Sequence, residues 1–180
     1  NATHVNLSKC KNIEGDGFRH FKEATHMNLE ESGQITDKGL VHLKNATHVN
    51  LTGCKKITDE GLKDLRKAKY VVLADTNITG KGLDHLKNAT YVNSSRNSHS
   101  SISPLSGLTN LIGLNLSENK IINVSPLASL TNLTMLGLRR NNLSSISPLS
   151  GMTSLKILAL SWNKINDVSP LSGMTNLKIL

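Results

Sequence analysis

The sequence repeats itself every 22 residues, and this period restricts the chain to folds in which small like units are stacked. In the C-terminal half, residues 111–132 read LIGLNLSENKIINVSPLASLTN, and the pattern returns over residues 133–154 and 155–176. The four prolines, at positions 104, 126, 148 and 170, keep the same interval. Stacked chains grow by adding units and have no single centre. We therefore expect one continuous array over residues 1–180.

The N-terminal half repeats with the same period but a different pattern. Its units span residues 2–23, 24–45 and 46–67, followed by a 21-residue unit over 68–88. Each unit opens with strand-like alternation, which in the third unit places Val49 on one side and His48 on the other. A turn and a short helix should follow, with Thr58 as the N-cap and with Leu62 and Leu65 facing inward.

The C-terminal units keep the strand but have a shorter return segment. Ser125 can cap a helical turn, and Pro126 suits the first helical position, so a single tight turn is expected. Leu127 and Leu130 should anchor this turn in the core. Because only 3% of the residues are aromatic against 37% hydrophobic, leucine, isoleucine and valine must build that core.

Residues 89–110 join the two patterns, so that the array divides into subarrays 1–88 and 111–180 with a hybrid repeat between them. In this seam repeat, Ser94 stands where the next unit has Leu116, and His99 stands where it has Ile121. An unpartnered buried polar group costs on the order of 1–3 kcal/mol. The seam is either a decayed repeat that the well-packed repeats on both sides tolerate, or a place where the curvature changes or the chain opens locally between the two subarrays, which we call a soft point.

The C-terminal units share the pattern LxxLxLxxN, which residues Leu111, Leu114, Leu116 and Asn119 illustrate. This pattern resembles the leucine-rich repeat family, over nearly the whole chain. The C-terminal units, with their SPLSGLTN phrase, resemble the bacterial internalin type, and the N-terminal units, with ITDEGL, resemble the cysteine-containing type. The resemblance implies an α/β-repeat fold: a right-handed solenoid with a parallel concave β-sheet and with short helices or 3-10 turns on the convex side.

The resemblance also implies an asparagine ladder, in which the side chains of Asn119, Asn141 and Asn163 bind backbone groups at the bend of each coil. Its equivalents in the first four units are Cys10, Ser32, Cys54 and Thr76. The two cysteines are two coils apart, so their Cα atoms should be about 10 Å apart. A disulfide reaches about 7 Å, and two buried thiols are therefore expected.

Three histidines share one outward column, His4, His26 and His48, and invite a metal interpretation because imidazole is a common ligand. Equivalent positions on adjacent strands form a line, whereas a zinc site needs a tetrahedral corner. We therefore predict no metal and no cofactor. The sequence has no nucleophile elbow, no phosphate-binding glycine loop and no HExxH, so we predict that this segment is not itself an enzyme.

The outward positions of the C-terminal units are apolar or small, with tryptophan and arginine beside them. Tryptophan and arginine are enriched at binding hot spots, and exposed apolar patches usually mark contacts. The alternative is scattered surface apolarity. We predict a partner-binding site on the concave face that consists of Met135, Arg139, Arg140, Ile157, Trp162, Tyr70 and Tyr91.

The formal net charge of +8 comes mostly from lysines in the connecting segments, which favours a solvated outer face. Nucleic-acid binding would require basic residues gathered on one face with interleaved aromatics, which is not seen. No apolar run is long enough to span a membrane. We expect no small-molecule substrate.

These observations predict a bacterial recognition module, secreted, on the cell surface or delivered to host cells, that binds a protein partner on the concave face. Two alternatives stay open: a substrate-recruiting arm of a larger enzyme such as a ubiquitin ligase, and a scaffold that spaces other domains. Since the sequence begins and stops within a repeat, we expect it to be a fragment of a longer protein.

Overall fold

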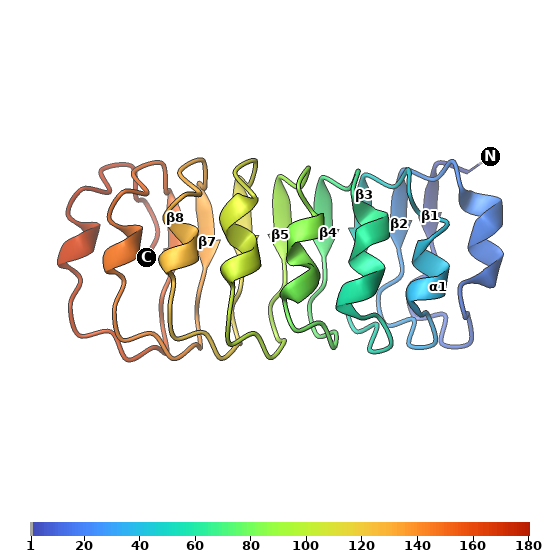
Figure 1. Cartoon of the computed structure of the whole chain (residues 1–180), viewed down its shortest axis with the longest axis horizontal. Helices are drawn as coiled ribbons and strands as arrows, with labels where there is room; N and C mark the ends of the chain where they lie inside the picture. Colours follow the sequence, from blue (N-terminus) through green and yellow to red (C-terminus); the bar gives the residue numbers. More distant parts are fainter. Residues whose placement is uncertain (1) are drawn as a thin grey trace.

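The computed structural model describes residues 2–180 as a solenoid with one parallel eight-stranded sheet in the order β1 to β8 (Figure 1). The strands are β1 His4–Asn6, β2 His26–Asn28, β3 His48–Asn50, β4 Tyr70–Val72, β5 Tyr91–Asn93, β6 Gly113–Asn115, β7 Met135–Gly137 and β8 Ile157–Ala159. A single bridge joins Ile157 to Ile179. Each strand pairs with the strand of the next repeat, in the register that the 22-residue period predicts.

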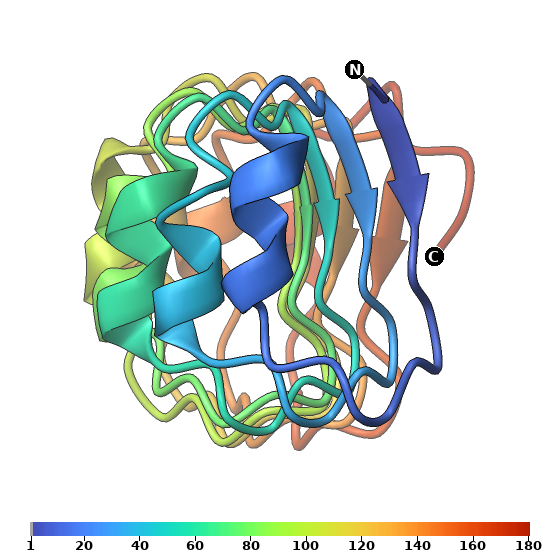
Figure 2. The same cartoon turned by 90° about the vertical axis from the view of Figure 1, so that its right-hand side faces the viewer.

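The return segments form the opposite side of the solenoid, where short helices lie over the core (Figure 2). They are η1 Asp16–Phe21, α1 Asp37–Leu40, η2 Asp59–Leu65, η3 Lys81–His85, η4 Ser103–Gly107, η5 Ser125–Leu127, η6 Ser147–Leu149 and η7 Ser169–Leu171. All except α1 are 3-10 helices, and they shorten toward the C-terminus as the sequence predicts. Within the described residues no helix is long and apolar enough to cross a membrane.

The predicted helix caps are right in the N-terminal half and wrong in the C-terminal half. Thr58 is the N-cap of η2, where its side chain accepts a hydrogen bond from the Glu60 backbone N–H. Ser125 is the first residue of η5, whose N-cap is Val124 and has no side-chain cap bond. Asn123 Oδ1 accepts the Ser125 N–H at 2.8 Å, and in η7 Asp167 Oδ1 accepts the Ser169 N–H at 2.8 Å. The first backbone N–H of each of these two helices is therefore satisfied by a side chain two residues upstream.

The core runs the length of the array between the sheet and the helices, and it consists almost entirely of aliphatic side chains. The predicted inward residues Leu62, Leu65, Leu127 and Leu130 are all fully buried. Because each layer is covered by the layers before and after it, no coil has to form a core alone.

The asparagine ladder is present as predicted. Asn119 Nδ2 donates to the carbonyls of Ser94 and Leu116, each at 3.0 Å, while its Oδ1 accepts the His99 N–H at 3.0 Å. Asn141 repeats this pattern one coil further on. One side chain thus satisfies three backbone groups and ties two coils together.

The N-terminal equivalents make fewer bonds. Ser32 Oγ donates to the Leu7 carbonyl at 2.7 Å, and Cys54 Sγ donates to the Leu29 carbonyl at 3.1 Å. Burial raises the pKa of the Cys54 thiol to about 11, although its hydrogen bonding with the Ser32 backbone opposes the shift. Both cysteines are free thiols, but the expectation that both are buried is wrong for Cys10, which is half-buried because no described coil packs on its outer side.

The seam repeat buries its two polar residues completely. Ser94 Oγ and His99 Nε2 are 2.7 Å apart, so each is the partner of the other. His99 Nδ1 has no hydrogen-bond partner among the described residues and faces Gly80, where an added Cβ would lie 3.0 Å from that nitrogen. Burial lowers the pKa of His99, and the Thr79 backbone and the Asp59 carboxylate oppose the shift only in part.

Candidate binding surface on the sheet

We define the sheet face as the outward side of strands β1 to β8. The register aligns its residues in columns, one of which contains His4, His26, His48, Tyr70, Tyr91, Gly113, Met135 and Ile157. The neighbouring inward residues, from Met27 to Leu158, are buried. The predicted outward column is therefore confirmed.

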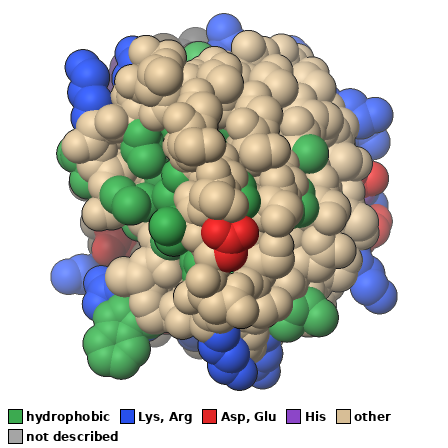
Figure 3. All heavy atoms as spheres, turned by 90° about the vertical axis from the view of Figure 1, so that its left-hand side faces the viewer, with side chains coloured by type: hydrophobic (Ala, Val, Ile, Leu, Met, Phe, Trp, Pro, Cys, Tyr) green, Lys and Arg blue, Asp and Glu red, His purple; other side chains and the backbone are tan. Residues whose placement is uncertain are grey.

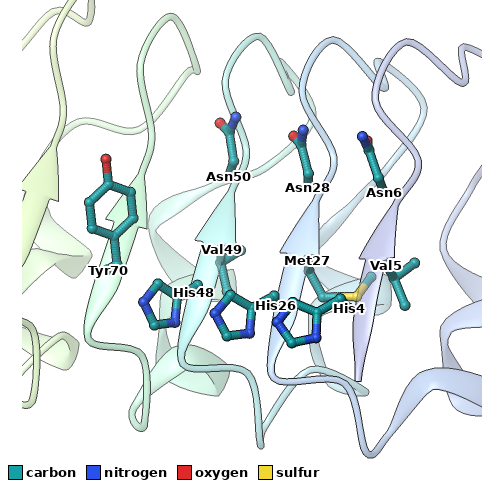
Figure 4. Close-up of a pocket in the computed structure, with 10 residues that line it drawn as sticks. All are labelled: His4, Val5, Asn6, His26, Met27, Asn28, His48, Val49, Asn50 and Tyr70. Carbon is teal, nitrogen blue, oxygen red and sulfur yellow. The ribbon is translucent and has the colours of Figure 1, made fainter. Parts of the chain in front are cut away.

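At the N-terminal end, the three histidines form a stack that we call the imidazole row (Figure 4). The ring centroids of His4 and His26, and of His26 and His48, are 4.1 Å apart, with the planes within 15° of parallel. Tyr70 and Tyr91 stack beyond it at 4.4 Å, after a wider step of 5.9 Å from His48 to Tyr70.

A threonine before each histidine fixes the orientation of the imidazole. Thr25 Oγ1 and Thr47 Oγ1 lie 2.9 and 3.0 Å from the Nδ1 atoms of His26 and His48. Each hydroxyl also lies 3.2 Å from the carbonyl of the threonine one coil earlier, to which it can donate its proton. When it does, Nδ1–H donates to the hydroxyl oxygen and Nε2 is a hydrogen-bond acceptor; when the hydroxyl donates to Nδ1 instead, Nε2–H is a donor.

The imidazole row does not form a metal site. Among residues 2–180 no group of three or more His, Cys, Asp or Glu side chains could hold a metal ion. Parallel rings direct their Nε2 lone pairs along parallel lines, whereas metal ligands must converge on one point. Partial burial, together with the neighbouring His48 and His4, lowers the pKa of His26, so its imidazole stays neutral to lower pH than usual.

A second row consists of Asn6, Asn28 and Asn50 at the other end of the same strands (Figure 4). In each, Oδ1 accepts the backbone N–H two residues further on, at 3.0 to 3.2 Å. The amide nitrogen Nδ2 is therefore directed outward, and in Asn50 it donates to Glu30 at 3.3 Å. We call these residues the amide row.

The middle of the sheet face joins the predicted tyrosines to the predicted apolar residues. An added Cβ at Gly113 would lie 2.7 Å from Cδ2 of Tyr91, so the tyrosine ring covers this glycine. The residue after Gly113 in this column is Met135, which is 40% exposed. With the half-buried Ile157 and the exposed Ile179, Tyr91 and Met135 form an apolar band along the C-terminal half of the sheet face.

Beside this band lies a row of residues that leave their strands in the left-handed conformation. It includes Arg96, Glu118, Arg140 and Trp162, with φ between 53° and 61°. Glu118 lies between the two arginines, 3.5 Å from Arg96 and 3.7 Å from Arg140. The Arg140 guanidinium is 5.3 Å from the centroid of the Trp162 ring. A bulky residue with positive φ is uncommon, and here the turn of each repeat requires it.

Trp162 is 70% exposed and stands where the sheet face meets the C-terminal end of the stack. Hydrophobic side chains gather on this end (Figure 3), and those of Leu160, Trp162, Ile165 and Leu180 line a hollow of about 360 Å³. Of the predicted site residues, Arg140 and Trp162 are in contact, and Tyr70, Tyr91, Met135 and Ile157 share one column. Arg139 is exposed and makes no ion pair with the described residues.

Comparison with known proteins now identifies the repeat. The family described as leucine-rich repeats in two copies matches residues 109–151 and 131–173, and a single leucine-rich repeat matches residues 47–65. The structure of internalin C2 from Listeria monocytogenes superposes with a TM-score of 0.89 and 30% sequence identity, covering 99% of this chain and 80% of that one. The chain belongs to the leucine-rich repeat family. It is internalin-like in its repeats and fold.

Two further internalin structures from Listeria monocytogenes are similar. InlF has a TM-score of 0.80 and 26% identity over 89% of this chain and 48% of its own. The functional domain of InlJ, which includes a cysteine ladder, has a TM-score of 0.75 and 21% identity over 99% of this chain and 36% of its own. At this level of identity the similarity shows the fold alone. A comparison with curated protein sequences finds no match. Leucine-rich repeat proteins of this kind generally act in protein–protein recognition.

Proposed function

We propose that this leucine-rich repeat array is a recognition module that binds a protein partner on the C-terminal half of the sheet face. The observation that carries the proposal is the uncovered apolar band beside the Arg140–Trp162 pair. Internalin C2 and InlF, the more similar structures, come from Listeria monocytogenes. We infer a bacterial protein that is secreted, surface-exposed or delivered to host cells.

The composition of this area suits a protein partner. Met135, Ile179 and Trp162 are 40%, 59% and 70% exposed, and removing apolar area from water yields about 25 cal/mol per Å². Arg140 is held between Glu118 and the Trp162 ring. Its long side chain therefore loses less conformational entropy when a partner binds. Arginine and tryptophan with restricted freedom are the residues that most often dominate binding energy.

Affinity capture with a double variant tests this site. The immobilised chain should retain a partner from extracts of surface proteins, and Trp162→Ala/Arg140→Ala should retain at least tenfold less. The matched control is Lys120→Ala/Ile122→Ala, which removes an exposed cation and an exposed apolar side chain outside the sheet face. Equal capture by the double variant and the control would place the partner elsewhere.

A further inference from the structure

We propose that the N-terminal half of the sheet face is a separate ligand site, and that its ligand is an uncharged, linear β-1,4-linked glycan lying across the strands. The imidazole row and the amide row form the two sides of a groove of about 420 Å³, which Tyr70 closes at one end (Figure 4). Its volume is within the range of ligand-binding clefts. The site shares no residue with the Arg140–Trp162 pair.

The first argument is charge. The chain has a net charge of +8, and 19% of its residues are charged. No outward position of strands β1 to β8 has a lysine, arginine, aspartate or glutamate. One carboxylate, that of Glu30, contacts the amide row by accepting from Asn50 Nδ2, and Lys69 precedes β4. A surface kept free of fixed charge in a basic protein favours an uncharged ligand over an acidic or basic one.

The second argument is the hydrogen-bonding inventory. Each imidazole of the row has an Nε2 atom without a partner among the described residues, which donates or accepts according to the tautomer. The Nδ2 atoms of the amide row donate. In each coil the two residues are two positions apart on one strand, about 6.7 Å. A hydroxyl group can donate and accept at once, so the hydroxyls on opposite edges of one sugar ring can meet both rows.

The third argument is the spacing of the rows. Both repeat with each strand: the strand backbones are about 4.8 Å apart, and the imidazole centroids are 4.1 Å apart. An extended peptide presents equivalent groups about every 6.7 Å, and a polyproline helix about every 9 Å, so neither stays in register with the rows. A pyranose chain linked through equatorial 1,4 bonds advances by nearly one strand spacing per sugar. Successive sugars are turned over, but every sugar presents a hydroxyl on each edge, and a hydroxyl can donate or accept. The three coils of the rows would then take three successive sugars.

The test is an NMR titration of the full chain with cellohexaose at pH 7.5. We expect binding, with shifts confined to β1–β4. His26→Phe keeps the stacked ring but loses both nitrogens, and Asn28→Ala loses the amide; each should weaken binding about three- to tenfold, as one lost hydrogen bond predicts. Asn115→Ala is the matched control, because Asn115 Oδ1 makes the same turn bond, to the Ser117 N–H at 3.0 Å, outside the two rows.

Each remaining result decides the proposal. Trp162→Ala/Arg140→Ala should leave cellohexaose binding unchanged, which separates this site from the proposed protein site. Maltohexaose, whose axial linkages curve the chain, should bind at least tenfold more weakly. No binding of cellohexaose, equal binding of the two sugars, equal losses in Asn28→Ala and Asn115→Ala, or tighter binding of polyglutamate than of cellohexaose would overturn the proposal.

Discussion

The two halves of the sheet face rest on the same coil but present different chemistry. Strands β1 to β3 carry imidazoles and amides in two rows, whereas β7 and β8 carry Met135, Ile157 and small residues beside Trp162. Beneath both halves the inward residues are apolar, and from Met27 to Leu158 they are buried. The stability of each coil therefore depends on its inward residues, its ladder residue and its turns. The outward residues can vary with the ligand without disturbing the fold.

The halves also differ in how the coils are tied together, and the largest expected effect tests this difference. Asn141 satisfies the Leu116 and Leu138 carbonyls and the Ile121 N–H inside the core. Asn141→Ala leaves these groups without partners, and we expect the free energy of unfolding to fall by about 3 kcal/mol. Urea denaturation measures it.

Ser32→Ala provides the comparison from the N-terminal half. Its hydroxyl makes one ladder bond, to the Leu7 carbonyl, so the expected loss is about 1 kcal/mol. Equal losses in Ser32→Ala and Asn141→Ala would show that the number of ladder bonds does not distinguish the two halves.

The seam between the halves provides the second prediction. Ser94→Leu/His99→Ile restores the residues found one coil later and removes the unpartnered Nδ1. We expect a gain of about 2 kcal/mol in the free energy of unfolding. Ser94→Leu alone should destabilise, because it leaves both His99 nitrogens unpaired.

Hydrogen exchange over residues 89–103 shows whether the seam is a soft point. We expect slower exchange in the double variant than in the wild type. Seam amides already as protected as their flanks in the wild type would contradict the soft-point interpretation and favour a decayed repeat that its neighbours tolerate.

Acidification should separate the halves as well, because every histidine lies at or before residue 99. Burial lowers the pKa of His99, and partial burial with His48 and His4 lowers that of His26, from 6.5. The unfolded chain then binds more protons, so stability should fall as the pH drops below about 6.5. For His99 we expect a loss on the order of 1 kcal/mol per pH unit at most, with His26 contributing less because it is more exposed.

Thermal melts at pH 7.5 and 5.5 measure this dependence. Ser94→Leu/His99→Ile should remove most of it. A double variant with the full wild-type dependence would assign the effect to the imidazole row or to another part of the N-terminal half.

The smallest expected effect concerns the junction of the two surfaces. Gly113→Ala should displace the Tyr91 ring, whose Cδ2 would be 2.7 Å from the new Cβ, and lower stability by up to about 1 kcal/mol. Gly107→Ala, where nothing lies within 4 Å of the added Cβ, is the control and should be neutral or slightly stabilising. NMR shifts of Tyr91 report the displacement; an unmoved ring in Gly113→Ala would contradict the close contact.

Most of the fold follows from the sequence because the period fixes the register. Counting by 22, with one unit of 21, places His26 beside His48 and Met135 beside Ile157, as the strand pairing confirms. The same count finds the asparagine ladder. It fails for Cys10, whose burial depends on what packs against the first described coil, and for Ser125, which lies one residue inside η5 and is not its cap.

The candidate surfaces were predicted less completely than the fold. Of the predicted residues of the C-terminal half, Met135 is paired with Ile157 and Arg140 contacts Trp162, and their role in binding stays a prediction. The sequence did not show that Tyr91 covers Gly113. The 22-residue period places Asn6, Asn28 and Asn50 in one column, but it does not show the turn bonds of their side chains. An asparagine followed two residues later by a turn is a usable signal for such bonds.

The sequence by itself determined which residues face the core and which lie side by side on the sheet, since a strict repeat makes both a matter of counting. Only the tertiary structure decided which contacts those neighbours make. Ser94 is hydrogen-bonded to His99, Thr25 and Thr47 orient the imidazoles, and Arg140 lies over Trp162. The physical reason is that a period sets backbone position, whereas hydrogen bonds and ring contacts depend on side-chain direction, which adjacent coils settle only when they pack.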